Sequence, residues 1–237
     1  MCQDCGCGDV NLVPLELQTR ILARNDGVAG HNREHFVERG IFAVNVMGSP
    51  GSGKTAVLEA TARMLGDTSR VAALAGDLAT DNDAARLRRA GLRSRAIETG
   101  QACHLDAEMV HHELHHFDLT GTDYFFIENV GNLVCPAVYD LGQNANVVVL
   151  SVTEGEDKPL KYPTMFAKAD LVLLTKVDLL PYLPFVNVSA ILDALARVMP
   201  EPRVISLSPL TGVGVAEWLG WLTMSRESIL ARREVLA

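Results

Sequence analysis

The chain has 237 residues, 48% of them hydrophobic, and its formal net charge is −8. This length suits one large α/β domain, and no apolar run reaches the ~18–20 residues that a membrane-spanning helix needs. The acidic balance argues against nucleic acid as the main partner, and an N-terminus without a basic segment followed by an apolar one predicts no secretion signal and a cytoplasmic location.

Three of the five cysteines lie within the first eight residues, at Cys2, Cys5 and Cys7. In a cytoplasmic chain this density favours metal or redox chemistry over a disulfide framework. Removal of Met1 would add the α-amine of Cys2 as a fourth donor. Three sulfurs and one nitrogen suit square-planar Ni²⁺ or tetrahedral Zn²⁺, and the spacing does not choose between them. The alternative, a set of incidental thiols, leaves their density unexplained.

The segment between these cysteines and the first strand has two parts. Apolar positions at helical spacing over residues 14–25 predict an amphipathic helix. Glycines and polar residues over residues 25–33 then predict a flexible linker.

A phosphate-binding loop follows the strand that we expect over residues 41–47. It reads Gly48-Ser49-Pro50-Gly51-Ser52-Gly53-Lys54-Thr55, which matches G-x-x-x-x-G-K-[ST]. The glycines let backbone amides approach phosphate oxygens, Lys54 would reach the β- and γ-phosphates, and the Thr55 hydroxyl would hold Mg²⁺. A plain glycine-rich turn is the alternative, but an apolar strand before the loop and a helical pattern after it are the context that the motif requires. We therefore predict a nucleoside triphosphate site.

Apolar strands and helical patterns alternate along the rest of the chain. We expect strands over residues 41–47, 71–75, 95–98, 124–128, 147–152, 171–175 and 204–207, and helices over residues 56–65, 81–90, 105–117, 188–199 and 215–233. The alternation predicts an α/β P-loop NTPase fold, with a mostly parallel sheet of about seven strands and helices on both faces.

Acidic residues follow two of these strands. Asp77 and Asp83 come after the second strand, and Glu128 ends the fourth, where a Walker B acid stands. Carboxylates at strand ends near a triphosphate can ligate Mg²⁺ or position water, whereas the alternatives are helix caps and solvated turns. We predict that these three acids act together with Lys54 in catalysis.

Residues 175–178, T-K-V-D, are similar to the guanine-recognition motif N-K-x-D, with threonine in place of asparagine. The Asp178 carboxylate can accept from N1–H and N2–H of guanine, which adenine does not offer, and the Lys176 stem can lie against the base. The threonine removes one supporting hydrogen bond. Backbone amides of residues 206–208 would donate to guanine O6. The residues expected to hold the base are Thr175, Lys176, Asp178, Ser206 and Leu207, and they favour GTP over ATP.

Cys103, His104 and Cys135 lie on loops beyond strand ends and form a second candidate metal site. Two thiols and an imidazole are suitable ligands for a transition metal, but cysteines also simply pack in cores, and composition alone leaves both open.

Four histidines, at positions 111, 112, 115 and 116, form i, i+4 pairs on one predicted helix. Such pairs can bind metal, although a solvated helix face is the better interpretation of the sequence.

Several of these stretches carry a resemblance to a known family. They include C-x-x-C-G-C at the N-terminus, CHLD at residues 103–106, FIENVGNLVCP at residues 126–136 and SVTEGEDKPLKYP at residues 151–163. On these residues the chain resembles the HypB nickel-incorporation GTPases of hydrogenase maturation, which are nickel metallochaperones of the dimerising P-loop class.

The resemblance implies a GTPase that converts GTP to GDP and phosphate and delivers nickel during maturation of a [NiFe]-hydrogenase. It implies GTP or GDP, Mg²⁺ and Ni²⁺ as bound groups, with Zn²⁺ as a further metal, and places Cys103, His104 and Cys135 at a dimer interface. It also implies a homodimer favoured by GTP, and partners in the hydrogenase large subunit and a second nickel-handling accessory protein. No membrane partner is implied.

We expect residues 1–39 to form the cysteine motif, helix and linker, and residues 40–237 to form the P-loop GTPase domain. Two other functions stay open: a related metal-insertion GTPase that serves urease or a cobalamin enzyme, and a nickel or zinc buffer whose nucleotide site controls only association. A small-molecule kinase would leave the cysteines unexplained.

Overall fold

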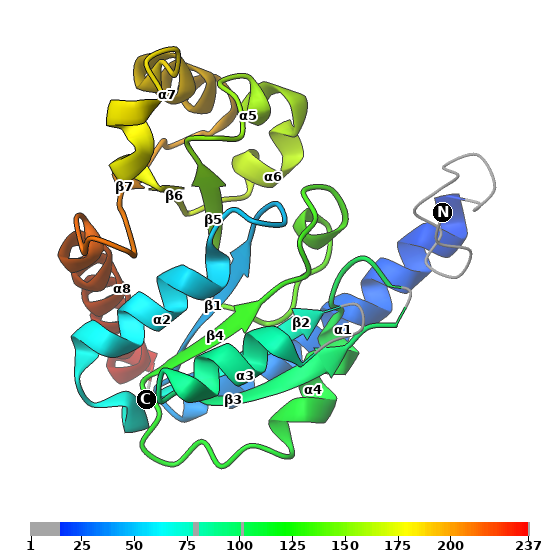
Figure 1. Cartoon of the computed structure of the whole chain (residues 1–237). Coiled ribbons are helices and arrows are strands. Elements are labelled where there is room, and N and C mark those ends of the chain that lie inside the picture. The colour runs from blue at the N-terminus through cyan, green and yellow to red at the C-terminus, as the bar shows by residue number, and fades with distance from the viewer. Residues whose placement is uncertain (1–14, 78–80, 101, 237) are drawn as a thin grey trace.

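The computed structural model describes residues 15–77, 81–100 and 102–236. Their centre is a seven-stranded parallel sheet with the strand order β3-β2-β4-β1-β5-β6-β7 (Figure 1). The strands are β1 (Phe42–Met47), β2 (Val71–Asp77), β3 (Arg93–Glu98), β4 (Tyr124–Glu128), β5 (Ala145–Ser151), β6 (Leu171–Thr175) and β7 (Val204–Ser206). The predicted sheet is confirmed, and its strand ends shift by one or two residues at most.

Helices cover both faces of this sheet (Figure 1). Alternate residues of β1 face opposite cores, as the pleat of a strand requires. Val44 packs in one core with Leu58, whereas Ala43 packs in the other with Phe36 and Val110. The α-helices are α1 (Leu15–Glu38), α2 (Lys54–Leu65), α3 (Asn82–Arg89), α4 (Ala107–Leu114), α5 (Lys158–Lys161), α6 (Pro163–Ala167), α7 (Val188–Val198) and α8 (Val215–Leu236), and the 3₁₀ turns are η1 (Thr68–Arg70), η2 (Cys135–Ala137) and η3 (Val177–Tyr182). No helix within these described residues is long and apolar enough to cross a membrane.

The linker predicted over residues 25–33 is wrong, because α1 runs through this segment without a break. Gly27 and Gly30 each cost a helix roughly 1 kcal/mol relative to alanine, which is why the sequence suggested an interruption. Tertiary contacts outweigh that cost. Phe36 is fully buried, and the buried side chain of Asn32 donates to two backbone carbonyl oxygens from distant segments of the chain.

Gly142 lets the loop that precedes β5 approach α1 closely. Its φ is +89°, and a Cβ at this position would lie 2.5 Å from the Cβ of Asn32 and 2.6 Å from the carbonyl oxygen of Ala29. Both the left-handed backbone and the close approach therefore require glycine here.

Candidate nucleotide and metal site

The phosphate-binding loop leaves the carboxyl end of β1 and leads directly into α2. Gly48, Gly51 and Gly53 all have positive φ, and a Cβ on Gly48 would lie 2.4 Å from the carbonyl oxygen of Val149. The loop lines a cleft of about 480 Å³ at the carboxyl ends of the strands. The N-terminus of α2 lines this cleft, so the free backbone amides of the first helical turn can donate to an anion bound there.

Lys54 and Thr55 begin α2 and are both buried. The ammonium of Lys54 donates to the carbonyl oxygens of Gly48 and Ser49, each at 3.2 Å. Burial lowers the pKa of Lys54, and the carboxylates of Glu128 and Asp83 oppose that effect. The lysine is thus held at the mouth of the loop, where a phosphate would replace the carbonyl oxygens as its partner.

The hydroxyl of Thr55 lies between two of the predicted acids. It is 2.7 Å from Oε1 of Glu128 and 3.0 Å from Oδ1 of Asp83. Glu128 is 2% exposed, and its Oε2 has no hydrogen-bond partner within the described residues. Burial raises the pKa of Glu128 to about 7, although the Thr55 hydrogen bond and Lys54 act in the opposite direction. A divalent cation beside Thr55 would satisfy Oε2 and favour the ionised carboxylate, so the residues present fit Mg²⁺.

Two further residues line this cleft. Asp77 is the last residue of β2, which runs two residues beyond the strand expected over residues 71–75, so Asp77 does not follow the strand as the sequence predicted. Arg86 was given no role from the sequence, yet its guanidinium binds Glu59 through two contacts, at 3.1 and 2.9 Å, and lies 3.5 Å from Asp83. Its position three residues after Asp83, on the same face of a predicted helix, was the signal that could have found it.

Some residues of the predicted guanine site make contacts that the sequence did not predict. The Thr175 hydroxyl donates to the carbonyl oxygen of Ser52 at 2.6 Å, and Nζ of Lys176 donates to that of Gly51 at 2.7 Å. The threonine therefore supplies a hydrogen bond to the phosphate loop although the motif's asparagine is absent. Asp178 follows on η3.

The predicted amide donors after β7 need a correction. The amide of Leu207 donates to the carbonyl oxygen of Leu174, and that of Ser208 donates to Val213. The first of these bonds extends the parallel pairing with β6 one residue beyond β7, and the second lies within the loop that follows β7, so neither amide is available to a base in this conformation. Ser206 ends β7 and is exposed.

Cys103, His104 and Cys135 come together in space. The two sulfurs are 3.1 Å apart, Sγ of Cys103 is 3.8 Å from Nδ1 of His104, and one ligand atom from each residue lies within 4.8 Å of the others. Burial lowers the pKa of His104, which keeps its imidazole neutral. Burial and the neighbouring Cys135 raise the pKa of Cys103. Two sulfurs and one neutral imidazole fit a borderline metal such as Ni²⁺ or Zn²⁺, whose binding would displace the thiol protons.

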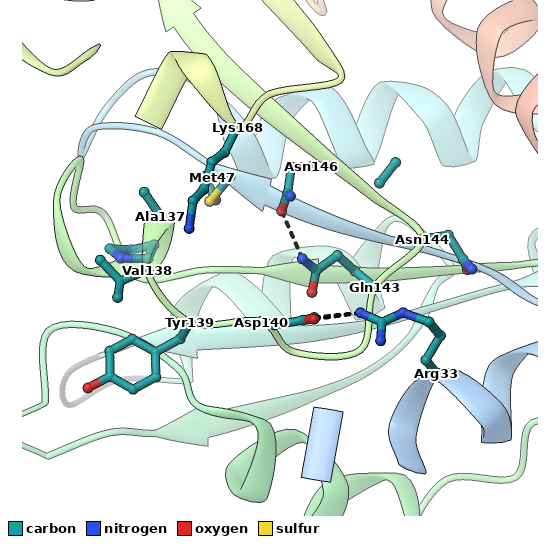
Figure 2. Close-up of a pocket in the computed structure, with 12 residues that line it drawn as sticks. Arg33, Met47, Ala137, Val138, Tyr139, Asp140, Gln143, Asn144, Asn146 and Lys168 are labelled. Carbon is teal, nitrogen blue, oxygen red and sulfur yellow. Dashed lines mark hydrogen bonds and ion pairs between the residues drawn. The ribbon is translucent and has the colours of Figure 1, made fainter. Parts of the chain in front are cut away.

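The segment after Cys135 anchors this site to α1. It lines a cleft of about 370 Å³. Within this cleft Arg33 of α1 pairs with Asp140, and Gln143 donates to Asn146 at 3.0 Å (Figure 2). Tyr139 extends from the same segment, and its ring stacks on His104 with the centroids 4.0 Å apart. Side-chain contacts therefore fix the imidazole ring of the candidate metal site.

The loop from Glu128 to Cys135 touches both candidate sites. Asn132 forms an antiparallel bridge with Gly48 of the phosphate loop, and its side chain donates to the carbonyl oxygen of Cys103. A Cβ on Gly131 would lie 2.8 Å from Cγ of Pro50, so this loop lies directly against the phosphate loop. The other predicted metal ligands, Cys2, Cys5 and Cys7, lie outside the described residues.

A family model described as "CobW/HypB/UreG, nucleotide-binding domain" matches residues 42–205. The chain belongs to the CobW/HypB/UreG family. The hydrogenase maturation factor HypB of Rhizobium leguminosarum bv. viciae is 48% identical over 221 residues, which cover 93% of this chain and 74% of that protein. The resemblance to the HypB family is therefore confirmed.

Two solved HypB structures are also similar to the chain. The structure of HypB from Helicobacter pylori in complex with nickel has a TM-score of 0.82 and 38% identity, covering 86% of this chain and 96% of that one. HypB from Archaeoglobus fulgidus has a TM-score of 0.79 and 40% identity, covering 86% of this chain and 100% of the other. The α/β P-loop fold expected from the sequence is confirmed by both.

Proposed function

We propose that the protein is a cytoplasmic GTPase that carries nickel and delivers it during maturation of a [NiFe]-hydrogenase. One observation carries this proposal: a single loop, from Glu128 to Cys135, contacts the phosphate loop at one point and the thiol pair at another. An arrangement of this kind suits a protein in which the state of the nucleotide governs the handling of a metal. The HypB relatives, which are hydrogenase maturation factors, support the biological setting.

Hydrolysis would use the residues of the larger cleft. The loop amides and Lys54 would hold the β- and γ-phosphates, with Lys54 leaving its two carbonyl partners for phosphate oxygens. Thr55, Asp83 and Glu128 would hold Mg²⁺. When bound, this ion supplies positive charge that offsets the negative charge developing on the phosphates. Asp77, at the end of β2, would position the attacking water.

Guanine would be selected by Asp178, whose carboxylate can accept two hydrogen bonds from that base. Lys176 supports this assignment because its backbone lies in the left-handed region, at φ 60°, and its ammonium reaches Gly51. The side chain is thereby stretched from the base-recognition loop to the phosphate loop.

The cargo metal would be bound at two places. Cys103, His104 and Cys135 form the site in the GTPase domain of residues 40–237, which takes Ni²⁺ or Zn²⁺. Cys2, Cys5 and Cys7 form a separate nickel site in residues 1–39. Hydrogenase large subunit and a second nickel-handling accessory protein would be the partners that receive or exchange the metal.

A second copy of the chain would cover the thiol site when GTP is bound. Val134 and Val138, on either side of Cys135, are 58% and 42% exposed, which gives the thiols an apolar rim. Burial of such a rim favours association. The three protein ligands also leave further coordination positions open for a second subunit.

The test uses cells that lack this protein and contain a [NiFe]-hydrogenase. Wild type should restore hydrogenase activity without added nickel, whereas Lys54→Ala and Cys103→Ser should each fail to restore it. Purified Lys54→Ala should also lose GTP hydrolysis. Full rescue by Lys54→Ala would mean that nucleotide hydrolysis is not required for nickel delivery. Restoration of urease activity instead of hydrogenase activity would mean that the protein serves a different metalloenzyme.

A further inference from the structure

His111, in the last turn of α4, and His115, the residue that caps its C-terminus, bring ring nitrogens together outside the thiol site. Nε2 of His111 lies 3.2 Å from Nε2 of His115, and the rings are nearly perpendicular. Their spacing of four residues places them on one face of the helix. His111 is half-buried and His115 is exposed, so the pair opens to solvent at one side.

The hydrogen bonds of Asn32 fix which nitrogen of His111 carries a proton. The side-chain amide nitrogen of Asn32 donates to the carbonyl oxygens of Ala107 and Leu141, which can only accept. Oδ1 of Asn32 must therefore be the atom that lies 2.9 Å from Nδ1 of His111. Because Oδ1 can only accept, Nδ1 of His111 donates, and in the neutral ring its Nε2 carries a lone pair.

This arrangement matches the way proteins prepare a histidine to bind metal. A ligand histidine usually donates its second ring N–H to a carbonyl or carboxylate oxygen, which fixes the tautomer and raises the basicity of the ligating nitrogen. Asn32 is fully buried, so it holds the ring of His111 in a defined orientation. The lone pair of His111 then faces His115.

We propose that His111 and His115 form a further metal site, which binds a borderline divalent cation such as Ni²⁺ or Zn²⁺ through their two Nε2 atoms. In the metal-free pair, His115 donates its Nε2 proton to His111. On binding, that proton leaves Nε2 of His115 and the same ring takes up a proton at Nδ1, so both rings stay neutral. His115 is exposed, and water can exchange the two protons.

The site has two protein ligands. Among residues 15–77, 81–100 and 102–236, the only group of three His, Cys, Asp or Glu side chains with ligand atoms within 4.8 Å of one another is Cys103, His104 and Cys135. Water would complete the coordination at the histidine pair, which favours weak, exchangeable binding. The pair lies at the C-terminal end of the helix that begins three residues after His104, so such a site suits a metal on its way to or from the thiols.

The C-terminal end of α4 and the residues just after it provide a matched control. His112 and His116 are also four residues apart, with ring centroids 5.1 Å apart, and both are exposed. In the described part of the chain, no hydrogen bond holds a ring nitrogen of either residue. If spacing alone were sufficient, this pair would bind as well as the first.

The experiment uses the full chain with all five cysteines replaced by serine, titrated with Zn²⁺ or Ni²⁺ against a chelating dye. With the site of Thr55, Asp83 and Glu128 kept saturated by Mg²⁺ throughout, one weak site should remain. His111→Ala/His115→Ala should lower its affinity by about tenfold or more, and His112→Ala/His116→Ala should leave it unchanged. His115→Ala alone, at an exposed position, should reproduce the loss without disturbing the fold.

A second measurement does not depend on the serine variant. With the thiol sites of the wild-type chain already filled, further Zn²⁺ should shift the Nε2 signals of His111 and His115 in nitrogen NMR while Nδ1 of His111 keeps its proton. A cysteine-free chain that binds no metal, binding that survives His111→Ala/His115→Ala, or equal loss in the control pair would each overturn the proposal.

Discussion

Asn132 and Cys103 are joined by a hydrogen bond of 3.2 Å from the side-chain amide of Asn132 to the carbonyl oxygen of Cys103. The backbone of Asn132 also pairs with Gly48 of the phosphate loop. A rearrangement around the γ-phosphate would therefore reach a residue of the thiol site through one side chain. Loops that contact the γ-phosphate commonly change their order when it is lost.

This contact predicts that nucleotide and metal binding are coupled. With Cys2, Cys5 and Cys7 replaced by serine, metal affinity should differ between GDP and a non-hydrolysable GTP analogue by ~1–3 kcal/mol, and metal should shift dimerisation reciprocally. Asn132→Ala should reduce the difference. The matched control is Asn187→Ala, which removes another asparagine hydrogen bond at the N-terminus of α7. Equal metal affinities in both nucleotide states, with dimerisation indifferent to metal, would refute the coupling.

A second prediction concerns the base. Asp178→Asn replaces an acceptor by a donor opposite guanine N1–H, so GTP binding measured by calorimetry should weaken by about 1–3 kcal/mol. Xanthine nucleotide, which has a carbonyl at position 2, should gain relative to GTP. Asp193→Asn makes the same chemical change on an exposed face of α7 and should leave both affinities unchanged. Wild-type GTP affinity in Asp178→Asn would mean that another residue selects the base.

The stability of the fold gives a third prediction. Gly142→Ala combines a positive φ with a clash against α1, and should lower the free energy of unfolding in urea by more than about 1 kcal/mol. Gly121→Ala isolates the first effect, because Gly121 has φ +71° and a Cβ there would meet nothing within 4 Å. Equal losses in the two variants would mean that the loop moves away from α1 without cost.

The sequence predicted those features that depend on local pattern. Buried parallel strands are continuous apolar runs, and the phosphate loop is contiguous, so both could be identified without knowledge of the fold. The histidine pair could not be interpreted in the same way. Its protonation pattern depends on Asn32, which lies 79 residues from His111 in the chain.

The two errors have the same origin. The linker at residues 25–33 was inferred from glycines, but tertiary contacts of α1 override local helix propensity. Leu207 was expected to donate to a base, but its amide donates to Leu174 of the neighbouring strand, a pairing that only the fold specifies.

The last prediction separates the two thiol sites. Cys2, Cys5 and Cys7 should bind one Ni²⁺ and produce a sulfur-to-nickel charge-transfer absorption in either nucleotide state. With Cys103, His104 and Cys135 already filled by Zn²⁺, deleting residues 1–8 should abolish that band. GTP hydrolysis should stay almost unchanged, because every residue proposed for hydrolysis lies between Gly48 and Glu128. Thiolates must form before they bind, so protons compete with the metal and the affinity should fall as the pH is lowered. Cys103→Ser/Cys135→Ser serves as the control and should retain the band. If the band survives the deletion and disappears in this control, the nickel that produces it is bound at Cys103 and Cys135 instead.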